Sequence, residues 1–131
     1  MRPVVLDASV GVKWLRDEPG SIEARELLQL HGAGEIVLIV PDLFVFEVLD
    51  VARRRLGTPA ASQLWKRLNA LRISVVPVGS PSFDDVVAIA ERLACSTYDA
   101  AAVVVAEAMG AELVSADVRA HSGVAGVRII G

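Results

Sequence analysis

A chain of 131 residues with 53% hydrophobic side chains is long enough to bury a core, and we expect residues 1–131 to form one domain. The mean hydropathy of +0.51 is high, yet no apolar run reaches the ~18 residues that a membrane helix requires, which argues against a membrane protein. A net charge of −3 excludes a generally basic nucleic-acid binder. The single cysteine, Cys95, excludes an internal disulfide framework, and we expect it in the core of a protein from a reducing, cytoplasmic setting.

Short β-branched runs alternate with longer helical stretches along the chain. The pattern predicts strands at Val4–Leu6, Ile36–Val40, Ser74–Pro77, Glu112–Ser115 and Val127–Ile130. It predicts helices near 9–16, 21–31, 43–56, 60–71, 82–94 and 98–109, several of them bounded by glycine or proline. Nearly continuous apolar strands are typical of a parallel sheet that is covered on both faces. Right-handed crossovers between them predict an α/β fold, a doubly wound three-layer α/β/α sandwich.

Four acidic residues lie inside or at the ends of apolar segments: Asp7, Glu47, Asp99 and Asp117. Carboxylates are rarely buried without a partner, because removing their charge from water is costly. Asp7 and Asp117 each follow a predicted strand, and ligands of open parallel sheets bind beyond the carboxyl ends of strands. If these two strands are neighbours, the two carboxylates face each other across that crevice.

Three of these acids also have a purely structural explanation. Asp7 could begin the helix that follows it, and Asp117 could cap a short turn at Val118–His121. The run Ser96-Thr97-Tyr98-Asp99 matches a capping box, in which the acid returns a hydrogen bond to the first residue.

Glu47 is harder to explain structurally, since it lies in an apolar helix between Phe46 and Val48. It could lie on a narrow exposed stripe with Asp50 and Arg54. A shared role for the four acids is favoured because all four structural explanations would otherwise have to hold at once.

An oxygen-only donor set favours Mg²⁺ or Mn²⁺ over zinc. His31 and His121 lack ligand spacing, and we expect both at the surface. A carboxylate-held Mg²⁺ keeps several waters and binds phosphate oxygens, so phosphoryl chemistry is its natural use. Ser9 and Ser115, each two residues from an aspartate, could hydrogen-bond a carboxylate or a metal-bound water, although Ser9 could equally be a helix cap. The sequence has no Gly-rich phosphate loop and no nucleophile elbow.

The basic residues are unevenly distributed, and six of the 13 fall between positions 53 and 72: Arg53, Arg54, Arg55, Lys66, Arg67 and Arg72. They could form a solvated helix face. They could instead form a rim beside the acidic site that contacts phosphates without sequence preference.

Four segments surround the acids in chain order: Val5-Leu6-Asp7-Ala8-Ser9-Val10, Pro41-Asp42-Leu43 leading to Glu47-Val48, Tyr98-Asp99-Ala100, and Val114-Ser115-Ala116-Asp117. Together they resemble the four motifs of PIN-domain ribonucleases. More narrowly, they resemble the VapC-type toxins of prokaryotic toxin–antitoxin pairs. The resemblance runs across essentially the whole chain, and Tyr98-Asp99-Ala100 at a helix start is its most specific part.

The resemblance implies a parallel sheet in the order 3-2-1-4-5, which makes the first and fourth strands neighbours. It implies that Mg²⁺ or Mn²⁺ is held by the four acids and that a metal-activated water hydrolyses an RNA phosphodiester. It also implies a homodimer and a cognate VapB-type antitoxin whose C-terminal segment covers the active-site groove. Apolar side chains beyond those that one helix layer needs fit such a partner, although core packing explains most of them: Trp14, Leu43, Phe44, Phe46, Leu64 and Trp65.

The expected protein is therefore a cytoplasmic, Mg²⁺-dependent endoribonuclease, with Arg53, Arg54 and, more weakly, Arg119 as RNA contacts. Asp50, one turn after Glu47, departs from the asparagine that such toxins often carry there. No second acid closely follows Asp117, which leaves one or two metal ions open.

Two alternative functions remain. A catalytically inactive PIN-like binding scaffold is disfavoured because all four acids are present. A metal-dependent phosphatase is disfavoured because Asp7-Ala8-Ser9 is not an Asp-x-Asp pair.

Overall fold

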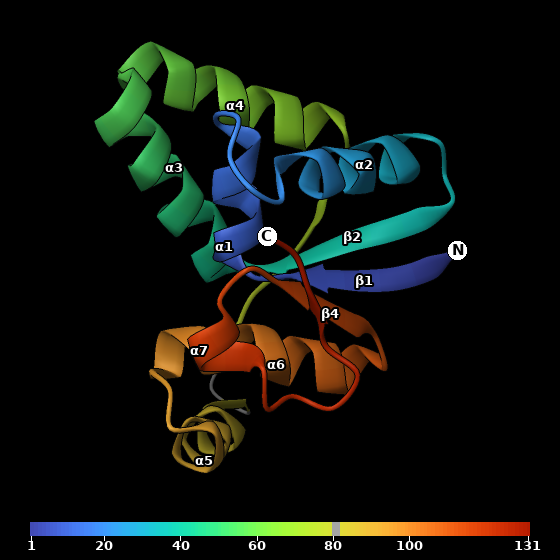
Figure 1. Cartoon of the computed structure of the whole chain (residues 1–131), viewed down its shortest axis with the longest axis vertical. Coiled ribbons are helices and arrows are strands. Elements are labelled where there is room, and N and C mark those ends of the chain that lie inside the picture. The colour runs from blue at the N-terminus through green and yellow to red at the C-terminus, as the bar shows by residue number, and fades with distance from the viewer. Residues whose placement is uncertain (80–81) are drawn as a thin grey trace.

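The computed structural model describes residues 1–79 and 82–131, and these form a three-layer arrangement around a five-stranded parallel sheet (Figure 1). The strands are β1 (Arg2–Leu6), β2 (Ile36–Pro41), β3 (Ser74–Val76), β4 (Glu112–Ser115) and β5 (Arg128–Ile129). They lie in the order β3-β2-β1-β4-β5, with every neighbouring pair parallel. The predicted sheet order and fold class are confirmed.

The helices divide between the two faces of the sheet. They are α1 (Ala8–Gly11), the 3₁₀ helix η1 (Val12–Trp14), α2 (Ser21–Gly32), α3 (Asp42–Leu56), α4 (Thr58–Ala70), α5 (Phe83–Leu93), α6 (Thr97–Met109) and α7 (Val118–His121). Figure 1 shows α2, α3 and α4 above the sheet and α5, α6 and α7 below it. None of the helices within residues 1–79 and 82–131 is long and apolar enough to cross a membrane.

The alternation of side chains along β1 explains the two layers. Val4 and Leu6 point to one face and are fully buried against residues of α1, α2 and α3. Val5, also fully buried, points to the other face and joins a core built with α5 and α6. Because both faces of the strand are covered, all three side chains are apolar.

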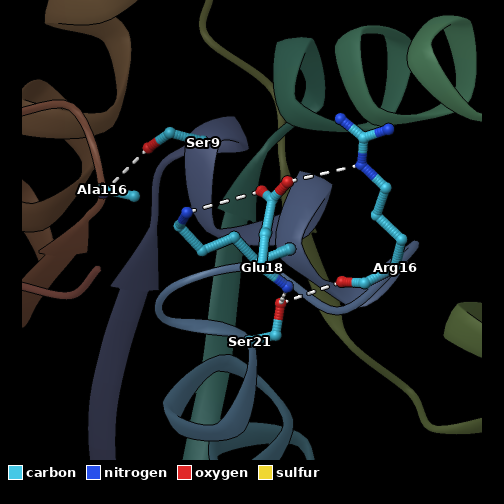
Figure 2. A network of polar contacts seen from close by, with 6 residues as sticks. Ser9, Arg16, Glu18, Ser21 and Ala116 are labelled. Carbon is cyan, nitrogen blue, oxygen red and sulfur yellow. Dashed lines mark hydrogen bonds and ion pairs between the residues drawn. The ribbon is translucent and has the colours of Figure 1, made fainter.

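The chain between β1 and α2 differs most from the prediction. The helix expected near 9–16 is the short α1 followed by η1. Beyond η1 the chain turns at Glu18, whose carboxylate lies 3.4 Å from Lys13 Nζ and 3.5 Å from Arg16 Nε (Figure 2). Ser21 Oγ donates to the Arg16 carbonyl at 2.9 Å and accepts from the Glu18 N–H at 3.0 Å. These contacts satisfy the turn's polar groups and begin α2 at the predicted residue.

Candidate active site

Asp7 and Asp117 lie at the carboxyl ends of neighbouring strands. Leu6 of β1 is paired in register with Val114 of β4, and the Asp7 N–H donates to the Val114 carbonyl at 3.1 Å. Asp7 is only 9% exposed, whereas Asp117 is half-buried. The structure thus brings these two predicted site residues together at the crevice where open parallel sheets bind ligands.

Both aspartates also cap helices, as the structural explanation supposed. Asp7 Oδ2 accepts from the Ser9 N–H at 3.0 Å, and Asp117 Oδ1 accepts from the Ala120 N–H at 3.0 Å. Each cap uses one carboxylate oxygen. Among the described residues, the second oxygen of each aspartate has no hydrogen-bond partner. Capping and ligand binding are therefore compatible, and the caps fix the orientation of both side chains.

Glu47 and Asp99 belong to the same region. The pKa of Glu47 is raised, first because burial removes part of its hydration and then because the negative charges of Asp7 and Asp99 oppose its ionisation. The Glu47 side chain nevertheless remains accessible to solvent, so we regard this desolvation as partial. Asp99 is half-buried, and its N–H donates to Ser96 Oγ at 3.0 Å, which confirms Ser96 as the cap of α6.

Cys95 links Asp117 to the same group. Burial is the main cause of the raised pKa of its thiol, and the negative charges of Asp99, Asp117 and Asp7 raise it further. Cys95 is half-buried rather than fully in the core. The four predicted acids therefore influence one another or a common neighbour, although they come from four separate elements.

Close packing of α1 on α3 contributes to this convergence. A Cβ atom at Gly11 would lie 2.7 Å from Phe44 Cζ and 2.7 Å from Val48 Cγ2, closer than carbon atoms approach each other. The backbone at Gly11 is ordinary right-handed helix, with φ −60°, so the glycine is needed for space. It lets the helix that Asp7 begins approach the helix that carries Glu47.

The donor chemistry of the four acids fits a hard divalent cation, because carboxylate oxygens are the preferred ligands of Mg²⁺ and Mn²⁺. Within residues 1–79 and 82–131, however, no three acidic, histidine or cysteine side chains already lie close enough to hold one ion. The ligand set remains a prediction, and binding would need the carboxylates to rotate toward a common point.

The two serines predicted to support the site hold backbone groups rather than carboxylates. Ser9 Oγ accepts from the Ala116 N–H at 2.9 Å (Figure 2). Ser115 Oγ accepts from the Asp117 N–H at 3.0 Å and lies 3.4 Å from Ser9 Oγ. The alternative role of Ser9 as a helix cap is not what the structure shows, because Asp7 caps α1.

The prediction of surface histidines was wrong for His121, which is completely buried. Its Nδ1 lies 2.7 Å from Ser115 Oγ, and its Nε2 lies 2.8 Å from the Asp99 carbonyl oxygen. The short helix capped by Asp117 turns the chain back over β4, and this return buries the ring. The cap at Asp117, four residues earlier, marks the start of this short helix but does not indicate that its last residue is buried.

His31 is half-buried rather than a free surface residue. Its Nδ1 accepts from the Leu38 N–H at 3.1 Å, and its Nε2 lies 2.7 Å from the Leu71 carbonyl oxygen. His31 thus joins α2 and β2 to the turn that follows α4.

One cavity is lined by two of the four acids. This cavity, of about 310 Å³, is lined by Asp99, Asp117 and Arg119, together with Cys95 and Ser96. A second, of about 440 Å³, is mostly apolar and lies along the starts of α3, α5 and α6. Its lining residues are Asp42, Leu43, Val78, Phe83, Val86, Val87, Thr97, Tyr98 and Ala101.

The three arginines that were predicted to contact RNA have different neighbours. Arg53 and Arg54 bind the Asp50 carboxylate at 3.0 and 3.1 Å, so the extra acid near Glu47 is matched by two cations. Hydrogen bonding from Arg53 is the main cause of a lowered pKa at Asp50. Arg119 joins none of the ion pairs among residues 1–79 and 82–131, and it lies beside Asp99 and Asp117.

The apolar residues expected at a partner surface divide into two groups. Phe44 is buried and packs edge-to-face on Trp14, with ring centroids 5.8 Å apart. Phe46 and Trp65 are 72% and 39% exposed, and they line a groove of about 440 Å³ between α3 and α4.

Comparison with known proteins identifies the fold. The family model of the PIN domain matches residues 4–126. No curated protein is significantly similar to this chain. Among solved structures, VapC20 of Mycobacterium tuberculosis, described as a sarcin–ricin loop cleaving toxin, has a TM-score of 0.75 at 17% identity and covers 95% of this chain and 98% of its own.

Two structures of toxin–antitoxin assemblies resemble this chain to about the same extent. DNA-bound VapBC from Salmonella typhimurium has a TM-score of 0.73 at 18% identity, covering 98% of this chain and 97% of the matched one. A toxin–antitoxin complex from Klebsiella pneumoniae has a TM-score of 0.72 at 17% identity, covering 95% of this chain and 94% of the matched one. At identities below 20%, the TM-scores of these structures establish a shared fold alone. Since the family model covers nearly the whole chain, this protein belongs to the PIN-domain family.

Proposed function

We propose that this chain is a cytoplasmic endoribonuclease toxin of the VapC type, a single PIN domain over residues 1–131 that depends on Mg²⁺ or Mn²⁺. The observation that carries the proposal is the position of Asp7 and Asp117 at the carboxyl ends of the neighbouring strands β1 and β4, together with the negative charges of Asp7 and Asp99 that help to raise the pKa of Glu47. The sarcin–ricin loop cleavage named for the M. tuberculosis neighbour supports RNA as the substrate.

The four acids would hold the cation: Asp7, Glu47, Asp99 and Asp117. A bound divalent ion would supply an activated water and neutralise charge on the phosphodiester. The backbone caps at Asp7 and Asp117 each use one carboxylate oxygen, so the second oxygen of each could turn toward the ion.

RNA would approach over the smaller cavity. Arg119 lines that cavity with Asp99 and Asp117, so its guanidinium can neutralise a phosphate next to the acids. Arg53 and Arg54 are weaker contacts in this proposal, because each must exchange its bond with Asp50 for one with RNA.

The exposed groove between α3 and α4 is the surface we assign to a VapB-type antitoxin. Phe46 and Trp65 supply apolar area, and Arg53 adds a cation at its edge. The Klebsiella and Salmonella neighbours come from toxin–antitoxin assemblies, which supports this kind of partner. A homodimer also belongs to the proposal.

Asparagine substitutions separate the role of each acid as a ligand from its role as a cap. Asn keeps a side-chain oxygen that caps a helix about as well as Asp, but it removes the charge. Asp7→Asn and Asp117→Asn should therefore fold normally. Cleavage of total RNA should fall by more than the roughly 10–100-fold typical of losing an indirect metal contact.

The matched control is Asp50→Asn, on the same helix as Glu47 but paired with arginines. With Mg²⁺ present it should cleave RNA at nearly the wild-type rate, whereas a chelator should abolish cleavage by the wild-type protein. Full activity of both Asp7→Asn and Asp99→Asn would refute the proposal. If calorimetry detects no binding of Mg²⁺ or Mn²⁺, an inactive scaffold is favoured. Hydrolysis of a phosphate monoester would favour a phosphatase.

A further inference from the structure

The imidazole of His121 lies at the centre of a buried hydrogen-bond chain that joins three of the four acid-bearing segments. The chain runs from Ser9 Oγ to Ser115 Oγ at 3.4 Å, then to His121 Nδ1 at 2.7 Å. It continues from His121 Nε2 to the Asp99 carbonyl oxygen at 2.8 Å. Ser115 and His121 are both 0% exposed, so water does not compete for these bonds.

The bonding partners fix the direction of donation along this chain. A carbonyl oxygen only accepts, so His121 Nε2 carries a proton and donates to Asp99. In the tautomer that carries its proton on Nε2, Nδ1 is the acceptor of the Ser115 hydroxyl proton. The Ser115 oxygen then accepts from the Asp117 N–H and from the Ser9 hydroxyl. Ser9 Oγ in turn accepts from the Ala116 N–H, so every group in the chain is satisfied in one direction.

This chain connects the acids through their backbones. Ser9 belongs to the helix that Asp7 begins, Ser115 holds the Asp117 N–H, and His121 holds the Asp99 carbonyl. The register of β1 and β4 already fixes Asp7 against Asp117. Asp99 comes from α6, and the bond from His121 is its hydrogen-bonded link to the β4 side of the site.

We propose that His121 is a positioning residue of the acidic centre, holding the Asp99 backbone against the β4 side of the site so that the Asp99 carboxylate can turn toward a divalent cation shared with Asp7 and Asp117. The inference rests on the proposed function only in assuming that the acids bind a cation. An apolar ring of similar size would fill the same space, but it would leave the Asp99 carbonyl without this donor and the Ser115 hydroxyl without its acceptor. Metal affinity should therefore depend on the imidazole nitrogens as well as on its volume.

The test compares His121→Phe with His31→Phe. His31 is a matched control, because it also bonds through both nitrogens, but its partners lie on β2 and in the turn after α4. Mn²⁺ binding to each purified full-length variant would be measured by calorimetry, with folding checked by circular dichroism. We expect His121→Phe to weaken Mn²⁺ binding by roughly 10–100-fold and His31→Phe to leave it within about twofold, although both lose stability.

Two conservative variants keep the proposal falsifiable if His121→Phe does not fold. In His121→Gln the amide N–H can replace Nε2 and reach Asp99, whereas the shorter amide of His121→Asn replaces Nδ1 and reaches only Ser115. We expect Gln to recover more Mn²⁺ affinity than Asn. Equal affinity for Gln and Asn, or wild-type affinity for His121→Phe, would overturn the proposal.

Ring ¹⁵N spectra of the wild-type chain test the direction of donation independently. His121 and His31 should both show a protonated Nε2 and an unprotonated Nδ1. A protonated Nδ1 at His121 would overturn the hydrogen-bond chain that runs from Ser9 to Asp99. Wild-type protein that binds Mn²⁺ without cleaving RNA would refute the proposed function and leave this inference standing, whereas absence of Mn²⁺ binding would refute this inference as well.

Discussion

Removing the Ser115 hydroxyl should destabilise the fold far more than removing an exposed one. Ser115 is 0% exposed, and its oxygen accepts from the Asp117 N–H at 3.0 Å and lies 2.7 Å from His121 Nδ1. In Ser115→Ala both of these buried groups lose their partner. No side chain is truncated by more than one atom, so the cavity that remains is small and the lost bonds dominate.

The size of the effect follows from those two groups. A buried polar group left without a partner costs about 1–3 kcal/mol, and some relaxation of the Ser9 hydroxyl toward the vacancy is expected, so the total is roughly 2–4 kcal/mol. The entropy of unfolding is about 2.1 cal/mol/K per residue, which gives about 0.28 kcal/mol/K for this chain. The melting temperature should therefore fall by roughly 7–15 °C.

The assay is thermal unfolding followed by circular dichroism in a chelator, so that no bound ion shifts the midpoint. Ser62→Ala, at an exposed position of α4, is the control and should change stability by less than about 0.5 kcal/mol. If Ser115→Ala unfolds within about 3 °C of Ser62→Ala, the hydroxyl is not satisfying these two groups, and the reasoning fails.

Three further predictions address packing, charge and RNA binding. Gly11→Ala should lose about 1–3 kcal/mol in urea unfolding by overpacking, whereas Gly32→Ala, which meets open space, should not. Burial, followed by the charges of two aspartates, raises the pKa of Glu47 above its unfolded value near 4.5, so the folded chain holds that proton more tightly. Metal-free stability should then fall as the pH rises through and above this value, and Glu47→Gln should flatten that part of a thermal-unfolding series. Arg119→Gln should reduce the salt dependence of RNA binding by about 0.7 in log–log slope, and Arg53→Gln by less, in fluorescence anisotropy titrations.

The sequence allowed the sheet and the acids to be predicted because both depend on local patterns. Apolar runs ending in Asp7 and near Asp117 indicate the strand and the candidate site residue together, and the family resemblance supplies the strand order. The predicted strand at Glu112–Ser115 matches β4 at both ends. Such features need no knowledge of how distant segments pack.

The features that could not be predicted depend on contacts between distant segments. Burial of His121 requires α7 to fold back over β4 and against the start of α6, and no local pattern encodes that contact. The close approach of α1 to α3 at Gly11 joins segments that lie far apart along the chain. Whether the carboxylates converge on one ion depends on side-chain rotations that the metal itself would drive.

Glu47 occupies a different position on its helix from the three aspartates. Asp7 and Asp117 accept backbone N–H groups at the starts of α1 and α7, and Asp99 lies in the first turn of α6. Helix N-termini stabilise negative charge through their unpaired N–H groups. Glu47 lies inside α3, where those groups are already paired, so repulsion from its neighbours is not offset locally. A bound cation would provide the missing positive charge, and the ionisation of Glu47 should therefore be coupled to metal binding.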